Sequence, residues 1–389
     1  MKLRHPLRLA SALVLATALG ITVSASSGAA QSTWHGGEPH AALFVETDAT
    51  SGNSVLSYWR SSDGTISFAG SYKTGGNGAV AAGASADPLA SQDGLTLANN
   101  GADLLAVNAG TNTISVFSVS GTHLQLLQQI PSGGEFPDSI AASGRLVSVL
   151  NAGGAGSVAE FQWLGTQLVP IAGQVRSLNL PPYPLATSTN NPPDFHHGAG
   201  QVSYTPNGRF LIVTTKASTN SYDVFAVGPN GALAATPKVT ASVNALPFSF
   251  VFDAAGNVVA TEAGASAVTT YRVNNDGSLT ELGTVDDNEA ALCWISGANG
   301  YFFGSNAGSG NVSVFTETSS GAPVLASTTP TPAHAGTTDS VVSPDGHFLY
   351  VESGGAGTID AYAIGSGGTL TPIETVFNIP LASEGLAIS

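Results

Sequence analysis

Three histidines occupy positions from which they could act in catalysis. His196 and His197 are adjacent, and His334 follows in a later part of the chain. His196 precedes Gln201 by five residues and His334 precedes Asp339 by five, so these two histidines hold equivalent places in two copies of a repeat. Because histidine titrates near neutral pH, it is the usual general acid or base and a common metal ligand. The spacing predicts that the three side chains meet at one mouth of the molecule, although adjacent histidines on a loop are often only solvated.

Further polar residues are expected around the same mouth. They end one set of predicted strands (Asn108, Asn151, Lys216, Glu262, Asn306 and Glu352) and begin another (Asp93, Asp138, Asp339 and Glu384). Carboxylates that converge without cations raise one another's pKa values or hold a hard cation such as Ca²⁺. The four acids of the second set are therefore candidate ligands of a divalent cation. The alternative is that each acid binds backbone N–H groups of the neighbouring part of the fold.

Few cations are available to meet a charged substrate at this mouth. Only Arg176 and Lys216 are expected to reach it, since the other Lys and Arg residues after residue 30 fall at turns on the far side, in or just after third strands, or on outer strands. A substrate with several carboxylates or a phosphate is poorly matched to one or two cations among acids. The sequence therefore favours a neutral or weakly charged ligand.

The elements that position these residues come from a repeat of short strands. Seven aromatic residues each follow a Val, Ile or Tyr by three positions, and successive aromatics lie between 44 and 64 residues apart: Tyr58, Phe117, Phe161, Phe225, Tyr271, Phe315 and Tyr362. A period of roughly 40–50 residues built from strands and turns is typical of a β-propeller. The sequence predicts an all-β propeller of seven four-stranded blades, in which the aromatics pack between blades.

The two ends of the chain predict how the ring closes. The N-terminal unit begins at a strand over residues 42–46 that corresponds to the second strand of the other units. The C-terminus supplies an extra strand over residues 384–388 that resembles the missing first one. Pairing the two would complete the seventh blade and leave no free sheet edge at the seam. Two interblade segments, residues 75–92 and 176–200, are unusually long and are expected to carry binding residues.

The N-terminal segment and the composition indicate where the protein is located and which partners it is expected to have. Residues 1–30 combine a basic start, an apolar run and small residues, which predicts a signal peptide, an exported protein and one propeller domain over residues 31–389. After residue 30, eight Lys and Arg face 26 Asp and Glu, a formal charge of −18. Such a chain is repelled by nucleic acid and anionic membranes, so neither is an expected partner, and we expect a monomer. Cys293 is the single cysteine, so no intrachain disulfide can form.

Two units carry a resemblance to a known family. Residues 104–108 (LLAVN) precede 112–117 (NTISVF), and residues 343–351 (SPDGHFLYV) precede 357–362 (GTIDAY). These motifs resemble the seven-bladed lactonase family, which includes 6-phosphogluconolactonase and the carboxymuconate-lactonising enzyme, and the YVTN-type repeat propellers. The resemblance implies the propeller fold and a lactone-hydrolysing ancestry.

The catalytic segment of the family is rearranged here. Family members carry Pro-His-x-His before the first strand of a middle blade, with an Arg and a Glu from later blades. The matching segment, residues 193–201 (PDFHHGAGQ), places its histidines a few positions early. Gly200 stands where the second family histidine would be, and Ala307 stands where some members have Arg.

Two functions from different classes follow. The first is an exported lactonase-like hydrolase that needs no cofactor, in which His196 or His197 is the general base, Lys216 or Asn306 steadies the oxyanion and Glu262 orients the base. Residues expected to contact the lactone or glycan are Asn108, Asn151, Asn306, His334, Arg176 and Glu352. The second is a non-catalytic extracellular propeller that binds a protein, a glycan or a divalent cation at the same mouth.

Overall fold

The computed structural model describes residues 41–183, 191–331 and 336–389, which form seven four-stranded antiparallel sheets. These residues fall within one compact unit, Pro39–Ser389. The predicted seven-bladed, all-β fold is confirmed. Helix in the described residues is limited to α1 (Lys216–Thr219) and the 3-10 turns η1 (Asn99–Gly101), η2 (Pro229–Gly231) and η3 (Ser366–Gly368). The predicted signal peptide lies outside the described residues.

The first four blades follow one another along the chain. Blade 1 consists of β28 (Leu386–Ile388), β1 (Ala41–Glu46), β2 (Ser54–Arg60) and β3 (Ile66–Lys73). Blade 2 consists of β4 (Leu95–Ala98), β5 (Asp103–Asn108), β6 (Thr113–Ser120) and β7 (His123–Pro131). Blade 3 consists of β8 (Pro137–Ser143), β9 (Leu146–Asn151), β10 (Ser157–Leu164) and β11 (Gln167–Ser177). Blade 4 consists of β12 (Gln201–Tyr204), β13 (Phe210–Thr214), β14 (Ser221–Ala226) and β15 (Lys238–Ala241).

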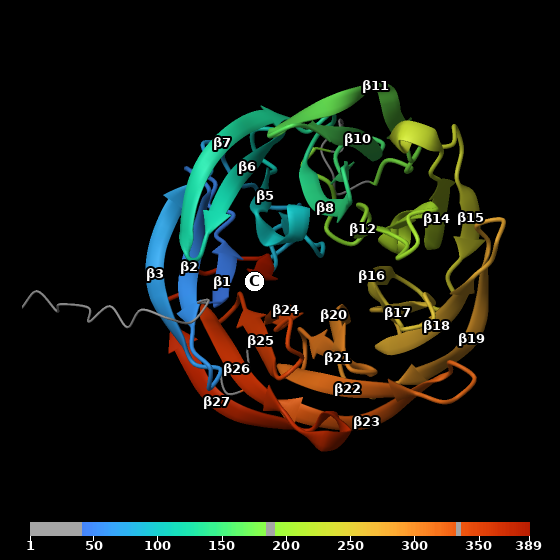
Figure 1. Ribbon diagram of the computed structural model, residues 1–389. Helices are drawn as coiled ribbons and strands as arrows, with labels where there is room; N and C mark the ends of the chain where they lie inside the picture. The colour runs from blue at the N-terminus through green and yellow to red at the C-terminus, as the bar shows by residue number, and fades with distance from the viewer. Residues whose placement is uncertain (1–40, 184–190, 332–335) are drawn as a thin grey trace, which may run out of the picture. The chain divides into compact units, whose positions relative to one another are not determined.

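The remaining three blades complete the ring. Blade 5 consists of β16 (Pro247–Phe252), β17 (Val258–Glu262), β18 (Ala267–Val273) and β19 (Leu279–Asp286). Blade 6 consists of β20 (Leu292–Ala298), β21 (Tyr301–Asn306), β22 (Asn311–Glu317) and β23 (Pro323–Pro330). Blade 7 consists of β24 (Thr337–Val342), β25 (Phe348–Ser353), β26 (Thr358–Ile364) and β27 (Leu370–Phe377). Figure 1 shows the first strand of each blade near the centre of the ring and the fourth at its rim.

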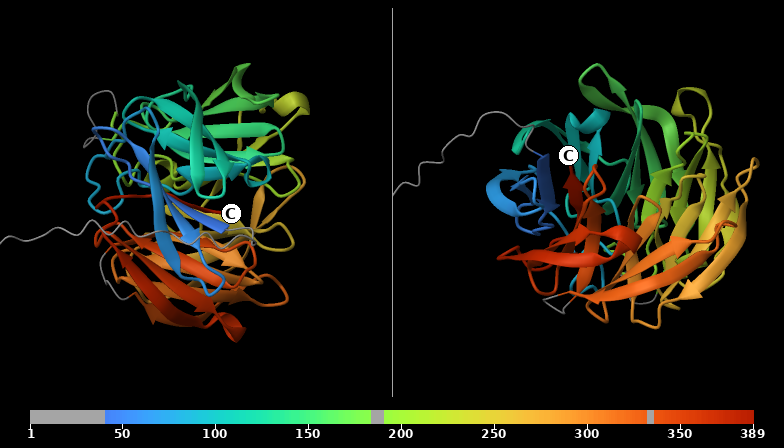
Figure 2. Two further views of the ribbon diagram at one scale, coloured as in Figure 1. Left: turned by 60° about the vertical axis from the view of Figure 1, so that its left-hand side comes forward. Right: turned by 60° about the horizontal axis from the view of Figure 1, so that its bottom comes forward.

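Ring closure joins the two ends of the chain. Strand β28 pairs antiparallel with β1, placing Leu43 opposite Ile388 and Val45 opposite Leu386. The N–H of Glu46 also donates to the carbonyl of Gly385 at 3.0 Å. Figure 2 shows the red C-terminal strand beside the blue first strand. The predicted closure is confirmed, and it removes two unpaired sheet edges that would otherwise be exposed.

The aromatic repeat is a packing device. Each of its members is at most 3% exposed: Tyr58, Phe117, Phe161, Phe225, Tyr271, Phe315 and Tyr362. The clusters they join combine side chains of adjacent blades, and Tyr271 of blade 5 lies 4.9 Å from the ring of Tyr222 in blade 4. Burying an aromatic side chain contributes about 1.5–3 kcal/mol, so these contacts hold the ring together.

Strand direction gives the ring two distinct faces. Because neighbouring strands are antiparallel, the turns between first and second strands and between third and fourth strands share one face, here called the turn face. The second-to-third loops and the interblade segments share the other, here called the insertion face. The described residues of the two long segments, 75–92, 178–183 and 191–200, therefore lie on the insertion face. No helix in the described ranges is long and apolar enough to cross a membrane.

Candidate functional site

Residues 87–92, here called the plug segment, cross the centre of the ring on the insertion face. Two backbone N–H groups of the segment donate to the Glu384 carboxylate at 2.9 and 3.2 Å. The hydroxyl of Ser91 donates to the carbonyl of Asp138 at 2.7 Å, and the indole N–H of Trp294 donates to the carbonyl of Ser91 at 2.7 Å. Glu384 precedes the first strand of blade 1, whereas Asp138 belongs to blade 3 and Trp294 to blade 6. The segment is thus bound from several sides of the ring.

The second insertion is bound to the first. The N–H of Ala82 donates to the carbonyl of Pro193 at 2.8 Å, and the N–H of Phe195 donates back to Ala82 at 3.1 Å. The buried ammonium of Lys216 donates to the carbonyls of Ala90 and Phe195 at 2.7 and 2.8 Å. The Lys216 side chain therefore joins the two insertions by binding one carbonyl of each. Lys216 was expected to steady an oxyanion, but the structure places its ammonium on these two carbonyls.

A cavity of about 210 Å³ lies between the two insertions and blades 5, 6 and 7. The rings of Phe248 and Trp294 form one wall, with centroids 5.0 Å apart. Most of the other lining groups are small or apolar, which limits the ligand to a small molecule with few charges. The lining residues are Ala84, Ser85, Ala86, Asp87, Phe195, His196, Leu246, Phe248, Ala263, Ala291, Cys293, Trp294, Ala307 and Thr338.

His196 is the predicted catalytic residue that lines this cavity. Its ring packs on the ring of Phe195 with centroids 3.6 Å apart. Burial lowers the pKa of His196, with smaller contributions from the charges of Lys216 and His197, while Asp194 acts in the opposite direction. The imidazole is consequently neutral near pH 7 and has a nitrogen free to take a proton.

His197 faces a different environment. Its Nδ1 lies 2.8 Å from Oδ1 of Asp194, and its ring stacks on Tyr183 with centroids 3.4 Å apart. The two histidine rings lie 6.4 Å apart at nearly a right angle. His197 does not line the cavity, so the structure brings one of the three predicted histidines to it. The third, His334, lies outside the described residues.

Asp87 of the plug segment forms a carboxyl pair with Glu384. Asp87 lines the cavity, and a side-chain hydrogen bond joins it to Glu384. Burial raises the pKa of both groups, and the charge of Asp87 raises the pKa of Glu384 further, whereas the hydrogen bond with Glu384 lowers the pKa of Asp87. The charge of Lys216 lowers the pKa of Asp87, while burial lowers the pKa of Lys216 itself. The pair therefore retains a proton at pH values where exposed carboxyls have lost theirs.

Small residues stand at two positions where the family resemblance implies a histidine and an arginine. A Cβ atom at Gly200 would lie 2.7 Å from the carbonyl oxygen of Phe248 and 2.9 Å from Oγ1 of Thr214, so no histidine fits there without movement of the backbone. Ala307 lines the cavity at the position where the family resemblance implies an arginine. The methyl group removes a cation and leaves space for an uncharged ligand.

Glu262, expected to orient the base, is occupied elsewhere. Its carboxylate accepts hydrogen bonds from four neighbours in blade 5 and in the segment before it: Ser242, Asn244, Thr269 and Tyr271. None of these contacts involves a histidine, and Glu262 does not line the cavity. The carboxylate instead links the end of β17 to β18 and to the β15–β16 connection.

Three asparagines expected to bind substrate also serve the blades. Asn108 donates through Nδ2 to Ser115 Oγ at 2.8 Å, and Asn306 donates to Ser313 Oγ at 2.9 Å, so each second strand is tied to the third. Asn151 donates to the carbonyl of Ser132 at 3.4 Å. All three side chains are fully buried outside the cavity lining, which leaves them no access to a ligand there.

Arg176 does not reach the mouth, contrary to expectation. It lies on β11, the outermost strand of blade 3, opposite Val158. Its guanidinium donates to the carbonyls of Leu233 and Ala234 at 2.7 and 3.0 Å, near the turn that follows β14 in blade 4. The sequence misplaced it because β11 runs for 11 residues and carries this position along the rim.

Two of the buried acids at the inner strands, Asp339 and Glu384, bind backbone N–H groups. Asp339 accepts from Ser340 at 2.8 Å and from Leu386 of blade 1 at 2.9 Å. Asp93 accepts from Gln201 Nε2 at 2.6 Å. Hydrogen bonds to the plug segment likewise occupy Glu384, whereas Asp138 and Glu352 are fully buried away from the cavity lining.

No three His, Cys, Asp or Glu side chains within the described ranges form a metal-binding group. The Ca²⁺ site at Asp93, Asp138, Asp339 and Glu384 stays a prediction.

Sequence reasoning missed two residues of the cavity, Asp87 and Trp294. Asp87 belongs to a Gly- and Ala-rich insertion that gives no signal beyond its length, and its partner Glu384 is almost 300 positions away. Trp294 follows Cys293 in the apolar stretch 291–295, which has the pattern of an ordinary buried strand. Burial raises the pKa of the Cys293 thiol, which therefore stays protonated.

Comparison with known proteins supports the fold. Residues 258–378 match the family model described as lactonase, 7-bladed beta-propeller. The predicted resemblance is confirmed. No curated protein matches the chain in sequence.

Solved structures match over nearly the whole ring. A periplasmic gluconolactonase from Pseudomonas aeruginosa is 17% identical, with a TM-score of 0.70 over 90% of this chain and 98% of that one. A candidate 6-phosphogluconolactonase from Bacteroides fragilis is 18% identical, with a TM-score of 0.68 over 90% and 98%. A protein from Lactobacillus plantarum is 17% identical, with a TM-score of 0.68 over 90% and 99%. At these identities the likeness shows the fold.

Proposed function

We propose that this protein hydrolyses a small, neutral or weakly charged lactone in the cavity beside the plug segment. One observation carries the proposal: His196 and Asp87 line the same small cavity, and their surroundings shift the two pKa values in opposite directions. A neutral imidazole beside a proton-bearing carboxyl pair is the arrangement needed for general base and general acid catalysis near neutral pH.

The proposed reaction conserves its atoms. His196 takes a proton from a water molecule as the water oxygen forms a bond to the lactone carbonyl carbon. The ring C–O bond of the resulting tetrahedral intermediate then breaks, and the leaving oxygen receives the proton held by Asp87 and Glu384. The product is the open hydroxy acid. Solvent returns the proton from the imidazolium to the carboxyl pair, and no cofactor takes part.

The cavity supports a ligand of low charge. Ala307 replaces the arginine implied by the family resemblance, and the ammonium of Lys216 is already bound to two carbonyls. A phosphorylated lactone would enter an apolar space without a free cation, at a large desolvation cost. The aromatic wall of Phe248 and Trp294 instead suits a compact ring such as δ-valerolactone or dihydrocoumarin.

The test is acid release from δ-valerolactone, dihydrocoumarin and glucono-δ-lactone, with His196→Gln, His197→Gln and Asp87→Asn compared against the parent protein. Loss of a general base or acid costs about 10²–10⁴-fold in rate, so His196→Gln and Asp87→Asn should fall by that amount. His347→Gln is the matched control because His347 lies on the turn face and is 71% exposed. Unchanged turnover in His196→Gln, or no hydrolysis of any of the three lactones, would refute the proposal.

We further propose that the protein is exported after cleavage near residue 30 and acts as a monomer outside the cytoplasm. The sequence of residues 1–30 supports export, and a structural neighbour is named as a periplasmic enzyme. N-terminal sequencing of the protein from the culture medium or periplasm should begin near Gln31. Recovery of the intact N-terminus from the cytoplasm alone would contradict it.

A further inference from the structure

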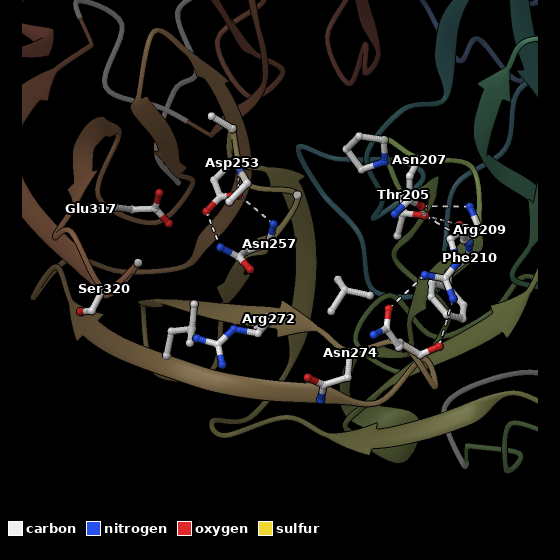
Figure 3. A pocket seen from close by; sticks show the side chains of 18 of the residues that line it. Thr205, Asn207, Arg209, Phe210, Asp253, Asn257, Arg272, Asn274, Glu317 and Ser320 are labelled. Atoms are coloured by element: carbon white, nitrogen blue, oxygen red, sulfur yellow. Dashed lines mark hydrogen bonds between the residues drawn. The ribbon is translucent and has the colours of Figure 1, made fainter.

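A second hollow lies on the turn face, away from the lactone cavity. It is a groove of about 700 Å³ formed by turns of three consecutive blades: 205–210 of blade 4, 253–257 and 272–275 of blade 5, and 317–321 of blade 6. Figure 3 shows side chains of these turns around the open space, with Arg272 on the blade 5 side and Glu317 and Arg209 at opposite ends. Its volume is in the range of ordinary ligand sites, about 300–1,000 Å³.

Arg272 is the unusual member of this groove. Among the residues the structure describes, its guanidinium makes no hydrogen bond or ion pair, and its side chain is exposed. Other arginines on the same face have partners: Arg60 pairs with Asp345 at 3.3 Å, and Arg209 donates to Asn275 at 3.1 Å while lying over the ring of Phe210. An arginine without a partner, in a chain with few cations, is free to bind an anionic group of a ligand.

Glu317 provides the opposite chemistry at the other side of the groove. Burial and the charge of Asp253 raise the pKa of Glu317 to about 7, whereas its hydrogen bond with Thr270 lowers it. In Figure 3 its carboxyl group points toward Asp253, and no ion pair joins it to Arg272 within the described ranges. Near neutral pH a fraction of Glu317 therefore carries a proton and can donate a hydrogen bond.

Neutral polar groups fill the space between these ends. Asn257 and Asn274 donate their Nδ2 hydrogens to neighbours, and their side-chain carbonyl oxygens accept no hydrogen bond from other described residues. The hydroxyl of Ser320 is a further exposed group on the rim. Two carbonyl oxygens without a hydrogen bond among the described residues, beside an exposed hydroxyl, match the many hydroxyls of a sugar better than an apolar ligand.

We propose that the turn-face groove binds a short carbohydrate that carries carboxylate groups, with Arg272 binding a carboxylate and Asn257 and Asn274 accepting from sugar hydroxyls. Phosphate esters fit less well, because a phosphate places its two negative charges at one point near Asp253 and Glu317, whereas each carboxylate of an acidic sugar carries one charge and the carboxylates lie on separate rings. The groove and the lactone cavity lie on opposite faces and share no residue, so either proposal can fail alone.

The experiment is calorimetric titration of the full mature chain with trigalacturonate, trimannuronate, triguluronate and neutral maltotriose. At least one acidic trisaccharide should bind saturably and at least tenfold more tightly than maltotriose, since a charge-assisted bidentate contact is worth that ratio. Arg272→Gln should lower that affinity about tenfold or more. Lys73→Gln, which removes an exposed cation outside the groove, should leave it unchanged.

Glu317→Gln keeps the proposal testable even if Arg272→Gln alters the fold. Raising the pH from 6 to 8 ionises Glu317 and should weaken binding of the acidic sugar severalfold, whereas Glu317→Gln should remove this pH dependence. The proposal would be overturned if none of the three acidic trisaccharides bound, or if they bound no more tightly than maltotriose. Full affinity in Arg272→Gln would overturn it as well. None of these measurements involves lactone turnover.

Discussion

The two faces of the ring use the same kinds of polar side chains in opposite ways. On the insertion face, Lys216, Glu384 and Glu262 each bind several groups of the chain itself, so their charges hold loops and strands in place. On the turn face, short turns leave an open groove in which Arg272 has no partner among the described residues. A charged residue near the axis of a propeller can therefore be a structural clamp, meaning a group that holds other parts of the chain in place, as readily as a group that binds a ligand.

Among the substitutions that test this difference between the two faces, replacement of Lys216 should lower stability the most. Lys216→Met removes the hydrogen-bond donor to two buried carbonyls and a cation beside buried Asp87, Asp138 and Glu384. Breaking a buried charge network from one side typically costs about 3–5 kcal/mol of unfolding free energy. Urea denaturation measures that loss, and hydrogen exchange should show faster exchange in residues 87–92.

Lys73→Met is the matched control for this prediction. Lys73 is exposed on β3, so its replacement should change the unfolding free energy by less than about 0.5 kcal/mol. Equal stability of Lys216→Met and the parent protein would show that Lys216 is not a clamp.

The acids of the insertion face should make stability depend on pH. Burial raises the pKa of Asp93 to about 6 and that of Asp339 to about 7, so the folded chain binds protons that the unfolded chain has already lost. Stability should therefore fall as pH rises from about 4 and level off above about 7, by about 4 kcal/mol for Asp339 alone.

Melting temperatures between pH 5 and pH 8 test this sign. Asp339→Asn should flatten part of the dependence, whereas Asp63→Asn, which alters a fully exposed carboxyl, should not. A protein that became more stable toward pH 8 would contradict the assigned burial of these groups.

Replacement of Glu262 tests directly whether this residue stabilises the fold or takes part in catalysis. Glu262→Gln replaces an acceptor of hydrogen bonds from Ser242, Thr269 and Tyr271 with an amide that cannot accept them all. We expect a loss of about 2 kcal/mol in unfolding free energy, with lactone turnover per folded molecule unchanged. Glu281→Gln, on an exposed position of β19, is the control. A drop in turnover without a drop in stability would restore Glu262 to the catalytic set.

The sequence predicts the blades well because their signal is local. The spacing of Tyr58 and its six counterparts reflects a strand that must bury an aromatic in every unit, and the missing strand at one end matches the extra strand at the other. Both inferences need only the period of the repeat and the requirement that sheet edges be paired.

The site was harder to predict because its contacts are not local. Asp87 meets Glu384, and Lys216 meets Ala90, across 126 residues or more of sequence. Asn108 and Glu262 sit at the expected strand ends, yet partners seven residues later in the chain, Ser115 and Thr269, bind their side chains. Residue type and strand position place a polar group near the axis, but the backbone donors around it decide whether it remains available.

The smallest expected effect is the difference in unfolding free energy between two arginine substitutions on the turn face. Arg60 pairs with Asp345 at 3.3 Å and lies over the Phe348 ring at 5.6 Å, which joins blade 1 to blade 7. Arg60→Gln should lower the unfolding free energy by about 0.5–1 kcal/mol, as a partly exposed ion pair allows. Arg272→Gln should change it by less than about 0.5 kcal/mol because no partner is lost. Thermal denaturation of both variants in low salt measures the difference. If Arg272→Gln were the more destabilising of the two, Arg272 would be a structural residue after all, and the contrast between the faces would disappear.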